Sequence, residues 1–185
     1  IAMQLSSTGS QLFVSHDNNK RLAQINLASR SVVADWSAGT DTNGAKTFFS
    51  FAAVPGMSQR VVTSTVQTGT DAFEVYDNGS LVASTTQFAS ACLLVPGNVD
   101  GEWFAIESKL SSPCQMQRLQ ITGATISPAV LMGDFPTPNG SAIFERKGQL
   151  MLIGSYWFDA ITLLPNGTRY NYAAGWDYDV PSQRL

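Results

Sequence analysis

Short alternations of apolar and polar residues fill the chain, and residues typical of tight turns separate them. The stretch EVYDNGSLVAS (74–84) shows the pattern, because one alternation ends at Asn78-Gly79 and a second one follows. Asn-Gly between two such runs is a strong hairpin signal, since a tight turn needs positive φ at its central residues. We find no segment with a 3.6-residue apolar period and caps at both ends. The pattern predicts an antiparallel, all-β protein.

The hairpin pattern returns at a regular spacing. In TLLPNGTRYNY, Asn166 lies 88 residues after Asn78, and in RLQITGATISP, Gly123 lies 44 residues from both Gly79 and Gly167. Blocks of about 40–50 residues with four short strands each are typical of β-propeller blades. The spacing therefore predicts a repeated unit of this kind.

The chain divides into four such blocks, at about 1–39, 45–87, 88–134 and 138–175, with a tail strand at 176–185. The first strands of the second and third blocks close on Pro55-Gly56 and Pro96-Gly97, 41 residues apart. The expected strands are 1–7, 11–16, 21–28 and 31–37; 48–56, 60–66, 71–77 and 80–86; 89–97, 102–108, 116–122 and 125–132; and 140–146, 149–156, 158–165 and 168–174. We predict one domain over residues 1–185, a β-propeller with four four-stranded antiparallel blades, either a small closed ring or part of a larger propeller.

One stretch also carries a family resemblance. QLFVSHDNNKRLAQINLASRSVVADWSAG (11–39) resembles one unit of the YVTN/NHL/lactonase-like propeller repeats, and FEVYDNGS and AITLLPNGT are similar to Kelch-like blades. The Trp-Asp and Gly-His marks of WD40 repeats are not regularly placed. The resemblance implies a propeller in which Trp36 and Trp103 pack between blades. It implies no activity, because one fold carries many functions.

Composition narrows the possible partners. The chain of 185 residues is 44% hydrophobic and 14% charged, with a net charge of −3. Its eleven basic residues are scattered from Lys20 to Arg184, which argues against a nucleic-acid partner. No apolar run approaches 18 residues, so no membrane span is predicted. The chain begins IAMQLSS, which suggests that a leader has been removed or that the sequence belongs to something longer.

Candidate catalytic residues are few. His16 is the one histidine, so a His-based triad or a multi-His metal site cannot be built. The expected innermost strands carry a single carboxylate, Glu145, and one carboxylate cannot supply the acid/base pair of a glycosidase. We therefore expect no metal, no cofactor and no catalytic set. The alternative is a hydrolase, lactonase or oxidase domain whose catalytic residues lie partly on blades outside this chain.

Propeller geometry predicts one face for ligands. The loops between second and third strands, and those between blades, lie on the same face of such a fold, and scaffolded loops commonly carry function. The candidates on this face are His16, Asp17, Asp41, Asp71, Trp157 and Asp159. Solvated loop acids are the alternative interpretation of the aspartates.

Cysteines and sequons favour an extracellular setting. Cys92 and Cys114 are expected at the same end of one blade, and we predict a disulfide if the 109–114 loop folds inward, with two buried thiols as the alternative. Asn-x-Ser/Thr sequons at Asn78, Asn139 and Asn166 fall on predicted exposed turns, where a glycan can sit. Together with the low charge, these features predict a secreted protein.

The function that these features favour is non-catalytic. We predict an extracellular propeller module for contact with a protein or a glycan, or for extracellular assembly. The terminal strands would leave unpaired sheet edges, and these predict closure of the ring or self-association with another chain.

Overall fold

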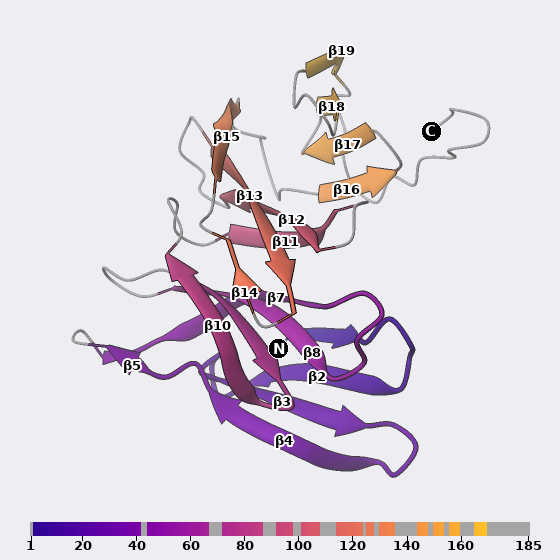
Figure 1. The fold of residues 1–185 in the computed structure, drawn as a ribbon, viewed down its shortest axis with the longest axis vertical. Coiled ribbons are helices and arrows are strands. Elements are labelled where there is room, and N and C mark those ends of the chain that lie inside the picture. Colours follow the sequence, from indigo (N-terminus) through magenta and orange to yellow (C-terminus); the bar gives the residue numbers. More distant parts are fainter. Residues whose placement is uncertain are drawn as a thin grey trace.

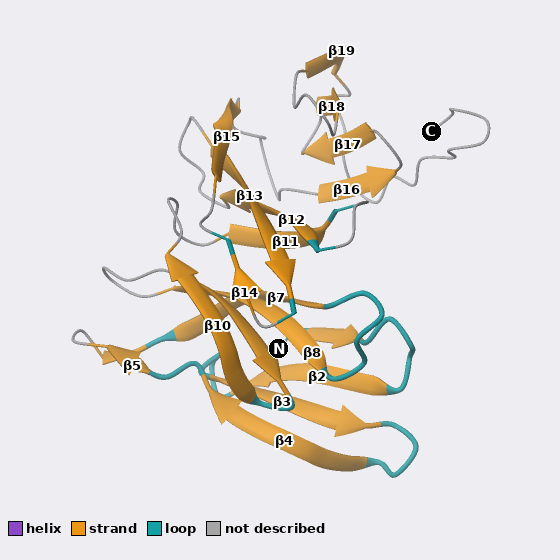
Figure 2. Ribbon diagram, viewed as in Figure 1, coloured by secondary structure: helices purple, strands orange, loops and turns teal. Residues whose placement is uncertain are grey.

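The described residues are organised as strands and turns (Figure 1; Figure 2). The computed structural model describes residues 2–41, 44–66, 72–86, 92–97, 101–107, 114–123, 125–127, 130–135, 144–147, 150–153, 156–159 and 165–169. Three four-stranded sheets, one five-stranded sheet and one two-stranded hairpin account for all of the strands assigned there. The predicted all-β fold with antiparallel pairing is confirmed.

The first sheet has the order β1-β2-β3-β4. Its strands are β1 (Met3–Leu5), β2 (Gln11–His16), β3 (Arg21–Asn26) and β4 (Ser31–Ser37). Between β2 and β3 the backbone has positive φ at Asp17, Asn18 and Asn19. Asp and Asn tolerate this region better than other non-glycine residues, which explains why the predicted polar turn can be so tight.

A two-stranded hairpin of β5 (Thr40–Asp41) and β6 (Gly44–Ala45) leads to the second sheet. The strands of this sheet are β7 (Thr47–Ala53), β8 (Arg60–Val66), β9 (Ala72–Asp77) and β10 (Ser80–Thr86). Asn78 and Gly79 have φ of 47° and 77° between β9 and β10, so the predicted Asn-Gly turn is confirmed.

The third sheet corrects one predicted strand. It contains β11 (Cys92–Pro96), β12 (Glu102–Glu107), β13 (Cys114–Thr122), β14 (Thr125–Ile126) and β15 (Val130–Phe135). The single strand expected over 125–132 is replaced by β14 and β15, which pair with opposite ends of β13. Pro128 lies between them in the sequence, and a proline has no N–H to donate to a β-ladder.

The fourth sheet corrects a predicted turn. Its strands are β16 (Phe144–Lys147), β17 (Leu150–Ile153), β18 (Tyr156–Asp159) and β19 (Pro165–Arg169). Asn166-Gly167 lies within β19 rather than between strands, so the third copy of the hairpin pattern was misassigned. Ile153 pairs with Tyr156, so β18 and β19 begin earlier in the chain than the strands expected at 158–165 and 168–174.

The second sheet is buried on both of its faces. Val61 and Tyr76 belong to a core shared with Phe13 and Trp36 of the first sheet. On the opposite face, Val62 and Phe73 belong to a core shared with Trp103 and Leu119 of the third sheet. The prediction that Trp36 and Trp103 pack between blades is confirmed. Each large apolar side chain buried in this way contributes about 1.5–3 kcal/mol.

The four large sheets form an open array. Contacts between described strands of different large sheets join consecutive sheets: β1 and β3 with β7, β7 and β8 with β11, β10 with β14, and β11 with β16. Strands of the first sheet lie at one end of the long axis and those of the fourth sheet at the other (Figure 1). The described strands therefore form an arc, not a closed four-sheet ring.

Candidate functional site

A cavity of about 390 Å³ lies between the second and third sheets. Its walls come from the turn between β7 and β8, from the turn between β11 and β12, and from the turn between β13 and β14. The apolar part of the lining includes Val54, Pro55, Met57, Pro96, Trp103 and Ile121. A volume of this size falls at the lower end of the range found for ligand pockets.

Arg60 is the basic residue in the cavity lining. Its Nη2 and Nε atoms donate to Asp77 Oδ2 at 2.6 and 3.2 Å, and its Nη1 atom donates to the Gly123 carbonyl at 2.7 Å. Arg60 and Asp77 face each other across β8 and β9, so strand pairing brings the two charges together. The guanidinium thus ties the second sheet to a turn of the third sheet and holds the cavity wall in place.

Glycines let the cavity turns approach the strands closely. A Cβ at Gly101, which has φ of +77°, would lie 2.4 Å from the Ile121 carbonyl oxygen. A Cβ at Gly97 would lie 2.5 Å from Glu102 Oε2. The Gly101 carbonyl accepts a hydrogen bond from the Ile121 N–H at 2.7 Å, which fixes the turn against β13. Larger residues at these two positions would push the walls apart.

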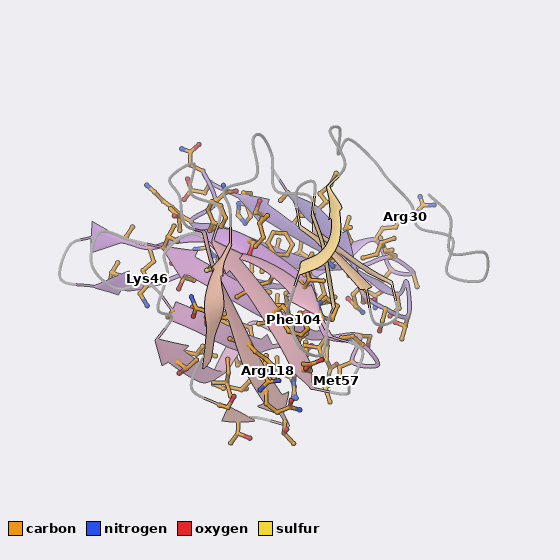
Figure 3. The ribbon with its side chains drawn as sticks, turned by 90° about the horizontal axis from the view of Figure 1, so that it is seen from above. Arg30, Lys46, Met57, Phe104 and Arg118 are labelled. Carbon is orange, nitrogen blue, oxygen red and sulfur yellow. The ribbon has the colours of Figure 1, made fainter. Side chains whose placement is uncertain are left out.

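Binding suits this lining better than acid/base chemistry. Glu102 is the carboxylate in the lining, and Arg60 already has an acidic partner outside the lining in Asp77. Among the described residues, no group of three or more His, Cys, Asp or Glu side chains is placed to hold a metal ion. Met57, labelled in Figure 3, lines the cavity with a flexible thioether and has 41% of its surface exposed. Met side chains of this kind adapt to partners of varied shape.

Sequence reasoning did not single out this cavity. It lies on the face formed by the turns between first and second strands and between third and fourth strands, opposite to the predicted ligand face. The available signal was the recurrence of Pro55-Gly56 and Pro96-Gly97, which we used only to set the repeat register. Pro55, Pro96 and Gly97 in fact line the cavity.

The structure describes the side chains of two candidates on the predicted ligand face, His16 and Asp17. His16 Nε2 lies 3.2 Å from Asp35 Oδ1, and Arg21 Nε donates to the same oxygen at 2.9 Å. Asp17 lies in the adjacent turn and is exposed. His16 thus pairs with a residue on β4 that was not predicted.

The other candidates on that face are only partly described, or not at all. Asp41 lies in β5, and Trp157 and Asp159 lie in β18, but their side chains are outside the described set. Asp71 lies outside the described residues altogether. Whether these side chains ring one mouth stays a prediction.

The predicted disulfide is not formed at Cys92. Its sulfur is a buried thiol that accepts a hydrogen bond from Gln117 Nε2 at 3.8 Å, while the Cys114 side chain lies outside the described set. The two cysteines lie on β11 and β13, with β12 between them. Two strand spacings of about 4.8 Å exceed the Cα separation of about 4.4–6.8 Å that a disulfide allows, unless the backbone moves.

One of the three predicted sequons is fully described. Asn78 is exposed on the turn between β9 and β10, and its N–H donates to the Gln59 carbonyl at 3.0 Å. Asn166 lies in β19, with its side chain outside the described set, and Asn139 lies outside the described residues. Glycosylation at any of the three stays a prediction.

A second polar cluster is buried between the first two sheets. Glu74, almost fully buried, accepts a hydrogen bond from the Tyr76 hydroxyl at 2.8 Å and pairs with Lys46 Nζ at 3.2 Å. Burial raises the pKa of Tyr76 above its ordinary value of 10.0, and the charge of Glu74 and this hydrogen bond raise it further. Lys46 lies just before β7, so the cluster joins a linker to the sheet core. With each charge matched inside the protein, this cluster is structural.

No family model matches the sequence, and no curated protein matches it. Solved structures do match. The WD40 domain of Toxoplasma gondii coronin aligns with a TM-score of 0.63 and 12% identity, over 91% of this chain and 44% of that chain. Kuenenia stuttgartiensis hydrazine synthase aligns with a TM-score of 0.60 and 10% identity, over 89% of this chain and 45% of that chain. The C-terminal WD40 domain of Sif2 aligns with a TM-score of 0.57 and 9% identity, over 88% of this chain and 44% of that chain.

These likenesses establish the fold: the chain has β-propeller architecture, and each large sheet is a blade. The predicted propeller is confirmed, whereas the narrower YVTN/NHL resemblance stays a prediction. At 9–12% identity, structural likeness does not require the Trp-Asp marks that this sequence lacks in regular positions. The chain spans somewhat less than half of the length of the structures that it matches, at 44–45%.

Proposed function

We propose that this chain is a non-catalytic, extracellular β-propeller module that contacts other proteins. In this proposal, the cavity between the second and third blades receives an apolar side chain from a segment of the partner. The observation that carries the proposal is the cavity of about 390 Å³, with its Pro, Met, Trp and Ile lining and an exposed Met57 at its mouth.

The arrangement of charge supports binding over catalysis. Arg60 is held by Asp77 and by the Gly123 carbonyl, so it shapes the wall and does not lie poised beside a reacting group. A pocket whose lining includes Pro, Met, Trp and Ile side chains, with an adaptable thioether at its edge, suits recognition of an apolar side chain. The described part of the chain contains no helix with the length and apolar character needed to cross a bilayer.

A displayed library of random peptides provides the test. Peptides selected on the intact chain are expected to share an apolar anchor residue and to lose at least about tenfold in affinity with Met57→Asp, because a charge at the mouth must be desolvated. Leu81→Asp is the matched control, since Leu81 is exposed on β10 and does not line the cavity. Selected peptides whose binding is unchanged by Met57→Asp, or a selection that enriches no binders, would contradict the proposal.

The extracellular setting has a separate test. Asn78 is exposed on a tight turn and lies within the sequence Asn-Gly-Ser, which supports its use as a glycan acceptor. Chain secreted from a eukaryotic cell is expected to lose mass on enzymatic removal of N-glycans, and Asn78→Gln is expected to reduce that loss. A secreted chain with the bare polypeptide mass would contradict glycosylation, and retention of the chain inside the cell would contradict the setting.

A further inference from the structure

We propose that Asn78 is a site of spontaneous covalent modification, at which the Gly79 backbone nitrogen attacks the Asn78 side-chain amide and converts the asparagine into aspartate or isoaspartate. The turn that contains both residues lies against the first blade, so the conversion also weakens the contact between the first and second blades. The modified residue takes no part in the cavity or in the binding proposed for it, and the reaction concerns chain whose Asn78 carries no glycan.

The reaction needs only the chain itself and water. The Gly79 nitrogen forms a bond to the Asn78 Cγ atom, and the bond from Cγ to Nδ2 breaks. Ammonia leaves, and it takes with it the proton of the Gly79 amide. The product is a five-membered succinimide ring. Water then opens the ring, at the Cγ carbonyl to give aspartate or at the backbone carbonyl to give isoaspartate. Asparagine is one of the thermolabile residues for this kind of reason.

The turn between β9 and β10 presents both reacting groups. Asp77 pairs with Ser80, so Asn78 and Gly79 form the whole connection between the two strands. Asn78 is exposed, and its own N–H donates to the Gln59 carbonyl at 3.0 Å. Among the described residues, the hydrogen bonds at this turn leave the Gly79 N–H unused. Glycine also has no side chain to shield its nitrogen, and its backbone rotates more freely than that of any other residue.

Asn26 is the first of the contrasting asparagines with described side chains. The nitrogen that follows it belongs to Leu27 and donates to the Ser10 carbonyl at 3.1 Å. Asn26 Oδ1 also accepts a hydrogen bond from the Ser29 N–H at 3.0 Å. Both reacting groups are therefore held in hydrogen bonds that an attack would have to break.

The turn between β2 and β3 provides the second contrast. Asn18 and Asn19 are exposed and have positive φ, as Asn78 does. The nitrogen that follows Asn19 belongs to Lys20, however, and it donates to the Asp17 carbonyl at 3.1 Å. Each of these two asparagines also precedes a residue with a side chain. Exposure, a following glycine and an unused N–H therefore coincide only at Asn78 among the asparagines whose side chains are described.

Gly79 connects the turn with the first blade. A Cβ atom added at Gly79 would lie 3.0 Å from Ala34 Cβ and 3.0 Å from Trp36 Cε3, so the backbone of the turn is in close contact with β4. Trp36 packs on Tyr76, with ring centroids 5.5 Å apart, in the core between the first two blades. The start of β10 lies beside the first sheet (Figure 1). Isoaspartate at position 78 lengthens the backbone by one carbon, which displaces Gly79 from this contact.

Peptide mapping by mass spectrometry tests the site, on chain made in a host without N-glycosylation. Folded chain is incubated in mildly alkaline buffer, and the conversion of each asparagine is followed with time. We expect Asn78 to convert at least about tenfold faster than Asn18, Asn19 and Asn26. Urea-unfolded chain is the positive control, because every site is open there. The map reports separately the Asn-Gly pairs at 43, 139 and 166, whose asparagine side chains lie outside the described set.

Urea unfolding of the incubated chain tests the coupling to the first blade. Asn78→Gln is the matched variant, because its longer side chain does not form the five-membered ring while every other asparagine stays the same. After equal incubation, the urea midpoint should fall further for the natural chain than for Asn78→Gln. Asn78→Asp supplies the charge without the longer backbone, and fresh protein should lose less than the isoaspartate form.

Three results would overturn the inference. Conversion of Asn18, Asn19 or Asn26 as fast as that of Asn78 would mean that the glycine and the unused N–H do not select the site. An Asn78 that stays intact in folded chain, while it converts in unfolded chain, would mean that the turn protects it. Equal falls in urea midpoint for the natural chain and Asn78→Gln would mean that the modification does not reach the first blade. Asn78→Ser replaces Asn78→Gln if circular dichroism shows that the glutamine variant does not fold.

Discussion

The two interfaces that flank the second blade are built from different chemistry. Toward the third blade, Phe73 and Val75 pack against Trp103 and Leu119 in an apolar core. Toward the first blade, the same strand β9 contributes Tyr76 to a second apolar core and also places a buried carboxylate, Glu74, in the interface. Alternation along one strand therefore delivers an apolar surface to one neighbour and a charged group to the other.

This difference gives the two interfaces different roles. The apolar interface mainly supplies stability, and the buried charge pair fixes how the first and second blades are placed against each other. Apolar burial is non-directional, so an apolar interface contributes free energy but tolerates small shifts. A buried carboxylate needs its partners at fixed positions, because an unpaired charge there costs several kcal/mol. We therefore expect the interface between the second and third blades to dominate the free energy of unfolding, and the interface between the first and second blades to be the more sensitive to charge.

The largest expected effect is at the apolar interface. Trp103 is fully buried there, so Trp103→Ala should lower the free energy of unfolding by about 3–5 kcal/mol through lost transfer energy and a residual cavity. That is a large share of the roughly 5–15 kcal/mol available to a domain. Urea unfolding followed by far-UV circular dichroism measures it. Trp103→Phe should cost clearly less, and equal losses for the two variants would show that volume does not control this interface.

The next effect is at the charged interface. Glu74→Gln should lower the free energy of unfolding by about 2–3 kcal/mol, because it leaves Lys46 without its counter-charge in a partly buried position. Lys46→Met in the same chain should recover part of that loss. A double-mutant cycle with these two changes should give a coupling energy above about 1 kcal/mol. Additive effects would mean that the pair does not act as a unit.

Sequence predicted the parts of this comparison that depend on local pattern. The bounds of β2, β4, β8 and β10 follow from alternation and turn residues, and the burial of both tryptophans follows from their size. The Glu74 cluster was missed because its partner Lys46 is 28 residues away, so nothing in the local pattern distinguishes this glutamate from an exposed strand residue. The cavity was missed for the same reason, since three turns from two blades form it.

The fourth blade shows where pattern reading fails. The turn signal that the sequence offers there, Asn166-Gly167, lies inside β19. Hairpin register depends on which turn the paired strands can use, and β17 pairs with β18 from Ile153 and Tyr156 onward. Because β18 begins at Tyr156, each later strand is displaced from the position expected for it.

A pH titration of the free energy of unfolding tests the burial of Tyr76 between the first and second blades. The folded-state pKa of Tyr76 is raised above 10.0 by burial and by Glu74, so above pH 10 the unfolded chain releases this proton while the folded chain keeps it. Its contribution to stability is present below pH 10 and is lost as the pH rises, by at most about 1.4 kcal/mol per pH unit. Urea midpoints between pH 9 and pH 11 should fall more steeply for the natural chain than for Tyr76→Phe. Parallel curves would contradict the burial of this phenol.

The smallest effect should come from charges outside any interface of the single chain. Asp35 pairs with Arg21 and His16, but this cluster is exposed to solvent, where water and salt screen the attraction. Asp35→Asn should therefore lower the free energy of unfolding by less than about 1 kcal/mol, and the loss should shrink further as salt is added. A loss as large as that of Glu74→Gln would show that burial is not what separates the two clusters, because each contains a carboxylate with a cationic neighbour at 2.9–3.2 Å.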